Sequence, residues 1–139
     1  MATRREARER ALGLCYELEA RGLAADELLD DLAVAPDEYA VRLVRGIDEH
    51  RDEIDVVVRK LSENWALERM PAIDRALLRM GGYELGWQRD LPRAVVIDEA
   101  VDLARQYSTK DSGRFVHALL NRMANELRPE VEARDGDSA

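Results

Sequence analysis

The chain has 139 residues, the length of one typical domain, which is enough to bury a hydrophobic core without a disulfide or a metal ion. The formal net charge is -8, aromatic residues make up only 5% of the composition, and Gly and Pro are few, so the composition favours helix over sheet. Cys15 is the single cysteine, which excludes an internal disulfide, and no Cys and His cluster has the spacing of a zinc site. We therefore expect no metal and no cofactor.

No apolar run approaches the roughly 20 residues that span a bilayer. The amino terminus is arginine followed by acid, rather than a charged stub that leads into a hydrophobic segment. These features predict a soluble, cytoplasmic protein without a membrane partner.

Helical periodicity and capping residues predict the secondary structure in chain order. An apolar stripe with helical spacing marks the first helix, and its members are Ala7, Ala11, Leu14, Cys15 and Leu18. Pro36 precedes a long helix, and Pro71 and Pro92 each fit the first turn of a new one. Asp111 or Ser112 is the natural N-cap of the last helix. The expected helices cover residues 3–22, 25–33, 37–63, 71–88, 92–106 and 112–128.

The fold class that follows is all-α. We expect one compact domain over 1–128, with about six or seven helices in two helical subdomains, about 1–64 and about 65–128. The segment from 129 to 139 is acidic and polar, and we expect it to be a disordered tail. Gly81 and Gly82 lie inside a predicted helix, where each costs about 1 kcal/mol relative to alanine, so close helix packing is expected to compensate.

The amino terminus is basic although the chain as a whole is acidic. "TRREARERAL" at 3–12 contains four arginines, of which Arg4, Arg5 and Arg8 fall within about 100° of each other on a helix, whereas Arg10 points elsewhere. Guanidinium groups contact phosphates bidentately and stack on bases, so this strip is a candidate RNA-binding surface. Tyr16 lies close to the direction of Arg5, where an exposed ring would stack on a base. The alternative for the arginines is that they belong to a solvated first helical turn and bind no RNA. The alternative for Tyr16 is a place in the core or at its boundary.

The sequence offers no arrangement for catalysis, so we do not expect an enzyme. His50 and His117 have no partner pattern that suggests a catalytic triad or a metal, and both are predicted to be structural. Adjacent carboxylates such as Asp98 and Glu99 point in different directions on a helix, and no glycine-rich phosphate loop is present.

The stretch "IDRALLRMGGYELGWQRDLPRAVVIDEAVDLARQYSTKDSGRFVHALLNRMA" at 73–124 strongly resembles the carboxy-terminal half of the NusB family of bacterial transcription antitermination factors. Its "YEL" at 83–85 and the motifs at 92–107 and 112–121 occur in the family's order, and "RREARERAL" resembles the family's arginine-rich opening. The resemblance implies a helical protein that binds the single-stranded boxA segment of nascent ribosomal RNA together with the ribosomal protein NusE, in the antitermination complex of RNA polymerase.

The same resemblance implies roles for individual residues. It places an acidic residue that faces NusE at Asp74, and it places the loop before the last helix near the RNA path. The RNA contacts expected from the basic strip, the tyrosine and this loop are Arg4, Arg5, Arg8, Tyr16, Lys110 and Arg114. Asp111 in that loop would repel phosphate, or cap the last helix, or both.

The sequence departs from the family pattern at three places. His117 and Ala118 replace an amide and a glycine in "FVHA", two glycines precede "YEL", and Glu6 interrupts the arginines. Two alternatives therefore stay open beside the antitermination factor. One is the NusB-like module of a ribosomal RNA methyltransferase, and the other is a helical homodimer whose arginines are only surface charge.

Overall fold

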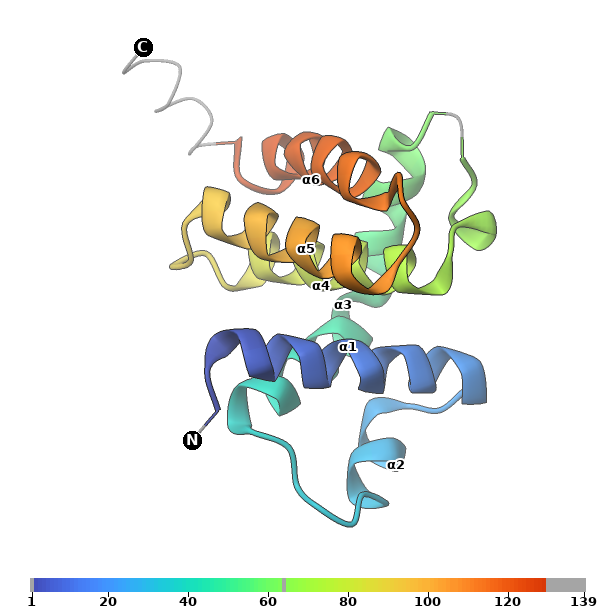
Figure 1. The fold of residues 1–139 in the computed structure, drawn as a ribbon, viewed down its shortest axis with the longest axis vertical. Helices are drawn as coiled ribbons and strands as arrows, with labels where there is room; N and C mark the ends of the chain where they lie inside the picture. Colours follow the sequence, from blue (N-terminus) through green and yellow to red (C-terminus); the bar gives the residue numbers. More distant parts are fainter. Residues whose placement is uncertain (1, 64, 130–139) are drawn as a thin grey trace.

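The computed structural model describes residues 2–63 and 65–129. The only regular secondary structure in these residues is helical (Figure 1). The all-α prediction is confirmed. The elements are α1 (Arg4–Arg21), α2 (Ala25–Asp30), α3 (Glu38–Leu61), the 3-10 helix η1 (Leu67–Arg69), α4 (Ala72–Trp87), α5 (Arg93–Tyr107) and α6 (Ser112–Leu127). Apart from Pro129, the tail predicted at 129–139 lies outside the described residues.

The basic amino terminus is an ordered first helical turn. The Thr3 hydroxyl accepts a hydrogen bond from the Glu6 N–H at 3.1 Å, and the Glu6 carboxylate accepts one from the Thr3 N–H at 3.2 Å. This reciprocal capping box satisfies two amide groups that have no helical partner. Glu6, which the sequence suggested only as an interruption of the arginines, therefore holds them on a fixed helix start.

Most predicted helix limits agree with the structure to within two residues, and two details differ. Pro71 and Pro92 occupy the N-cap positions of α4 and α5, one residue before the first turn, with ψ angles of 139° and 138°. α2 ends at Asp30 because the next amides bond to carbonyls only three residues back, which tightens and ends the helix. Asp111 is the N-cap of α6, but its side chain makes no capping hydrogen bond.

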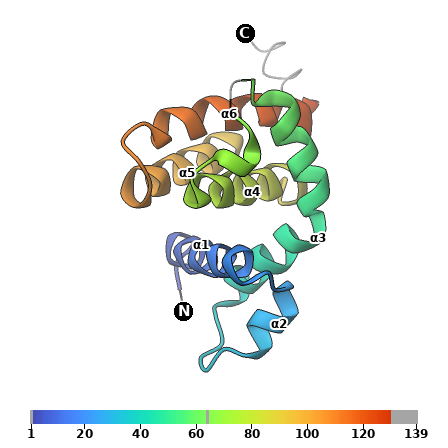
Figure 2. The ribbon, with the colours of Figure 1, turned by 90° about the vertical axis from the view of Figure 1, so that its right-hand side faces the viewer.

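The helices form two stacked groups that α3 joins. Figure 1 shows α4, α5 and α6 above α1 and α2, and Figure 2 shows α3 running along one side from the lower group to the upper one. The amino-terminal part of α3 carries Tyr39 against the α1 arginines, whereas its carboxy-terminal part packs Ile54 against α4. The division into subdomains at about residue 64 stays a prediction.

Two glycines let α4 lie at the centre of the upper group. A Cβ atom on Gly81 would lie 2.7 Å from Leu120 Cδ2 in α6, and one on Gly82 would lie 2.8 Å from Ile54 Cγ2 in α3. Both distances are shorter than real Cβ contacts, so the predicted close helix packing is confirmed.

Ion pairs made by α4 tie the two groups together. Arg79 pairs bidentately with Asp55 of α3, at 2.9 and 3.0 Å, and also donates to Glu19 of α1 at 2.7 Å. Arg75 pairs with the same Glu19 and donates to the Met70 carbonyl at 2.7 Å. α1 is therefore fixed against α4 by charged groups as well as by apolar packing.

A buried arginine closes the far end of α4. Arg128 is 2% exposed, and its guanidinium donates to four backbone carbonyls that end α4 and form the loop after it. The acceptors, at distances of 2.7 to 3.2 Å, are the carbonyls of Glu84, Leu85, Gln88 and Leu91. Two of these carbonyls also accept a backbone N–H, because Gln88 donates to Glu84 and Leu91 donates to Gln88. Arg128 therefore adds a side-chain donor to the end of α4 and to the loop after it.

Candidate nucleic-acid interface

Arg4 and Arg5 are the accessible cations of the α1 first turn. The Arg4 guanidinium carbon lies 3.7 Å from the centre of the Tyr39 ring, and its backbone is held by the capping box. Arg5 reaches α5, where Nε is 3.2 Å from Glu99 and Nη2 is 3.2 Å from Asp102, with the Arg5 side chain 33% exposed. Partly exposed ion pairs of this kind contribute little free energy, so a phosphate can replace a carboxylate partner.

The burial of Arg8 contradicts the sequence prediction for this residue. Its side chain was expected to contact RNA, yet it is 3% exposed and pairs with Glu84 of α4, which is 2% exposed. The Tyr39 hydroxyl donates to the same carboxylate. Arg8 is buried because its partner Glu84, 76 positions later in the chain, lies on α4 where that helix packs against α1. Arg8 is thus part of the core, and its charge is already compensated.

Burial raises the pKa of Tyr39 well above its ordinary value, and the negative charge of Glu84 and their hydrogen bond act in the same direction. The phenol therefore stays neutral and keeps donating its proton to Glu84. Arg8, Glu84 and Tyr39 form one buried polar group in which each member supplies a partner to another.

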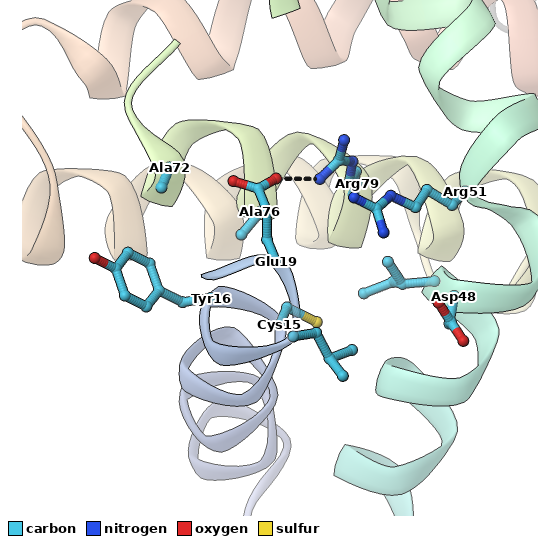
Figure 3. A pocket seen from close by; sticks show the side chains of 10 residues that line it. Cys15, Tyr16, Glu19, Asp48, Arg51, Ala72, Ala76 and Arg79 are labelled. Carbon is cyan, nitrogen blue, oxygen red and sulfur yellow. Dashed lines mark hydrogen bonds and ion pairs between the residues drawn. The ribbon is translucent and has the colours of Figure 1, made fainter. Parts of the chain in front are cut away.

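Tyr16 lies near the other end of α1, with 48% of its surface exposed. It lines a pocket between α1, α3 and α4, together with Asp48 and Arg51, and Figure 3 shows its ring directed away from both. The neighbouring Cys15 is buried, and burial raises the pKa of its thiol to about 12, so the thiol is unreactive. An exposed ring at this position is able to stack, and a base contact by Tyr16 stays a prediction.

The position of Asp74 also contradicts the sequence prediction. It was expected to face a partner, but it is 0% exposed. One carboxylate oxygen accepts from the Ser108 hydroxyl, and the other accepts from the Ser112 hydroxyl at 2.8 Å. The α5–α6 loop thus folds over the start of α4, and both oxygens are satisfied inside the protein. Asp74 therefore affects the protein surface only by holding the α5–α6 loop in place.

Lys110 and Arg114 do come together on the surface. They line a pocket of about 350 Å³ at the end of α5 and the start of α6. Its other lining residues are Arg105, Gly113 and His117. Arg105 was missed by the sequence analysis, and His117 was noted only as a structural histidine that departs from the family pattern. The available signal for His117 was its spacing from Arg114, because residues three apart on a helix share a face. Arg105 is on another helix, so spacing along the chain gave no signal for it.

Asp102 connects this basic loop to the basic start of α1. Its Oδ2 is 3.2 Å from Arg5 Nη2, and its Oδ1 is 3.9 Å from Arg105 Nη1. A second bridge joins the same two helices, because the Tyr107 hydroxyl donates to Glu9 at 2.6 Å. Two sets of cations that are about a hundred positions apart in the chain therefore lie side by side.

Neither a metal centre nor a membrane segment is found in the ranges 2–63 and 65–129. No group of three or more His, Cys, Asp or Glu side chains there is placed to hold a metal ion. No helix among these residues is long and apolar enough to cross a bilayer.

These features define a class of protein: a small helical protein, with six α-helices in residues 2–63 and 65–129, an exposed and a partly exposed arginine on its first helical turn and a basic loop beside them. Residues 5–125 match the profile of the NusB family. The transcription antitermination protein NusB of Kineococcus radiotolerans is 45% identical over 137 residues, which covers 96% of this chain and 100% of that protein. The chain belongs to the NusB family, as its motifs indicated.

Solved structures agree with this assignment. NusB of T. maritima superposes with a TM-score of 0.83 at 33% identity, over 96% of this chain and 98% of that one. A chain in a complex of the antitermination factors NusB and NusE with double-stranded RNA gives a TM-score of 0.76 at 27% identity, over 88% of this chain and 96% of that one.

Proposed function

We propose that this protein is a transcription antitermination factor that binds boxA-type RNA of nascent ribosomal RNA transcripts together with NusE. Two similarities support this function: the K. radiotolerans relative, which matches along its whole length, and the NusB–NusE complex with RNA. The proposed role is binding in the cytoplasm, without a catalytic step. It makes the protein an adaptor that holds RNA and NusE within the antitermination complex of RNA polymerase.

The observation that carries the proposal is the pair of arginines at the capped start of α1, of which Arg4 is exposed and Arg5 is partly exposed. Arg4 and Arg5 are held by a helix whose first turn is ordered before RNA arrives, so little conformational entropy is lost on binding. Arg5 exchanges Glu99 and Asp102 for a phosphate, and Lys110 and Arg114 contact the backbone next to it.

The acidic remainder of the chain restricts where RNA binds. A net charge of -8 repels polyanions over most of the surface, so the basic patch of α1 and the α5–α6 loop is the main place of attachment. NusE adds contacts to the same RNA, and the two proteins together bind it better than either alone. Tyr16 extends the proposed surface with a stacking contact.

The test is the double variant Arg4→Ala with Arg5→Ala, titrated with a boxA-type RNA at several salt concentrations, with and without NusE. Loss of two phosphate contacts should weaken binding and lower the slope of log K against log salt by about 1.4. The control is Arg45→Ala with Arg59→Ala, which also removes two cations, each of them exposed and in one surface ion pair. Equal salt slopes for the two double variants would refute the proposed RNA surface.

The two alternatives give different results in the same experiment. A homodimer whose arginines are only surface charge would sediment as a dimer and bind RNA no better than the double variant. A methyltransferase module would bind RNA without any gain from NusE. Tighter RNA binding in the presence of NusE supports the antitermination factor.

A further inference from the structure

The pocket at the α5–α6 junction is built from cationic and hydrogen-bonding side chains. Arg105 comes from the last turn of α5, Lys110 from the loop, and Arg114 and His117 from the first turns of α6. Glycine is the fifth lining residue, so none of the described residues that line the pocket is a carboxylate. Asp102 lies 3.9 Å from Arg105 Nη1, and Asp111 follows Lys110 in the loop, but neither lines the pocket.

Gly113 sets the position of Arg105. A Cβ atom at residue 113 would lie 2.8 Å from Arg105 Cγ and 3.1 Å from Arg105 Nε, so the arginine crosses the first turn of α6 at van der Waals contact. This brings the guanidinium close to the positive end of the α6 dipole. An anion is the ligand that relieves the resulting concentration of positive charge.

His117 contributes a hydrogen-bond donor. Its Nδ1 lies 3.3 Å from the side-chain nitrogen of Asn121. An amide nitrogen only donates, so Nδ1 accepts and the proton of the neutral ring is on Nε2. In this tautomer the ring offers its Nε2–H group, which suits an anionic oxygen.

Asp102 gives the pocket its connection to the proposed RNA surface. Its two oxygens face Arg5 on one side and Arg105 on the other, at 3.2 and 3.9 Å. If one RNA phosphate takes the place of Asp102 as the partner of Arg5, the next phosphates along the strand extend toward the pocket. The pocket is thus a continuation of the same path and does not require a second ligand.

We propose that Arg105 and His117, together with Lys110 and Arg114, form a pocket for a phosphodiester group of the bound RNA, and that Gly113 is required to place Arg105 in it. This inference rests on the proposed RNA-binding function and extends it by two contact residues and one positioning residue. Phosphate contacts carry no base information, so the pocket increases affinity for RNA of any sequence by the same factor.

Four variants test the pocket by RNA titration over a salt series: Arg105→Gln, Gly113→Ala, His117→Leu and the control Arg59→Gln. Loss of the Arg105 contact should lower the salt slope by about 0.7, equally for a boxA-type RNA and for a shuffled RNA of the same length. Gly113→Ala should cause a similar loss by displacing Arg105, although alanine favours the helix and circular dichroism should show α6 intact.

His117→Asn is the conservative variant, because an amide also donates an N–H. It should bind RNA like the parent, whereas His117→Leu should bind more weakly at every salt concentration. One outcome would exclude the pocket as a phosphate site. In that outcome the Arg4 and Arg5 double variant binds RNA more weakly than the parent, whereas the Arg105, Gly113 and His117 variants all bind RNA as Arg59→Gln does. Loss of binding by Arg105→Gln with parent-like binding by Gly113→Ala would exclude the positioning role of Gly113. If the Arg4 and Arg5 variant itself has no effect, the proposed RNA surface fails instead.

Discussion

Arg8 Nε lies 3.1 Å from both carboxylate oxygens of Glu84, and the two side chains are among the most deeply buried charged groups of the protein. The pair joins the second turn of α1 to the last turn of α4. An arginine in a segment that resembles an RNA-binding motif is therefore part of the packing that holds that motif in place. Its neighbours Arg4 and Arg5 remain at the surface, where we propose that they contact RNA.

Arg8→Ala should destabilise the protein strongly, because it leaves the Glu84 carboxylate buried without its cation. Removal of one partner from a buried ion pair lowers the free energy of unfolding by about 3 to 5 kcal/mol. Arg5→Ala is the control, since its ion pairs are partly exposed and should contribute less than about 1 kcal/mol. Urea denaturation of both variants measures the difference, and equal midpoints would contradict the structural role of Arg8.

The sequence predicted most helix limits because their signals are local. Pro71, Pro92 and the α6 cap act on the residues next to them, and the glycines of α4 implied close packing through the penalty that a helical glycine carries. Arg8 and Asp74 could not be assigned in the same way. Their burial depends on Glu84 and on two serines of the α5–α6 loop, which are adjacent only in the folded chain.

Asp74→Ala should lower stability and leave NusE binding by the folded protein unchanged. The substitution removes the carboxylate that accepts from the Ser108 and Ser112 hydroxyls, and a hydrogen bond to a charged group contributes about 1.5 to 3 kcal/mol. Thermal unfolding gives the first quantity, and calorimetric titration with NusE well below the melting temperature gives the second. A stable variant that no longer binds NusE would show instead that the carboxylate faces the partner.

Glu19 should make stability depend on pH in the acid range. Hydrogen bonds from Arg75, and then from Arg79, hold the pKa of its carboxyl at about 2, below the ordinary value of 4.5, although burial opposes the shift. The folded state therefore gains stability that is fully present above pH 4.5 and is lost as pH falls toward about 2. With partial exposure taken into account, the loss is on the order of 2 to 3 kcal/mol.

Glu19→Gln is the variant that isolates this effect. It cannot titrate, so it should be less stable than the parent at pH 7 and approach the parent's stability near pH 2. The free energy of unfolding of both proteins, measured by urea denaturation between pH 7 and pH 2.5, provides the comparison. Parallel curves over the whole range would mean that Glu19 keeps an ordinary pKa.

Asp111→Asn should leave thermal stability nearly unchanged and tighten RNA binding at low salt. The Asp111 side chain makes no capping hydrogen bond to α6, so the helix start does not need its charge. A like charge within about 10 Å of a bound phosphate is felt most where it is least screened. Fluorescence titration at low and high salt measures the effect. Weaker or unchanged binding at low salt would place this loop away from the RNA.

Arg128 has a consequence for the order in which the protein is made. Its guanidinium donates to the carbonyl of Leu85, a residue 43 positions earlier in the chain. The ribosome delivers the chain from its amino terminus, so α4 is synthesised well before the side chain that closes its end. During that interval, the Leu85 carbonyl lacks the Arg128 donor and bonds to water instead. The helices α4, α5 and α6 therefore reach their final packing only when residue 128 has left the ribosome, and until then the nascent chain exposes the apolar surfaces that these helices later bury.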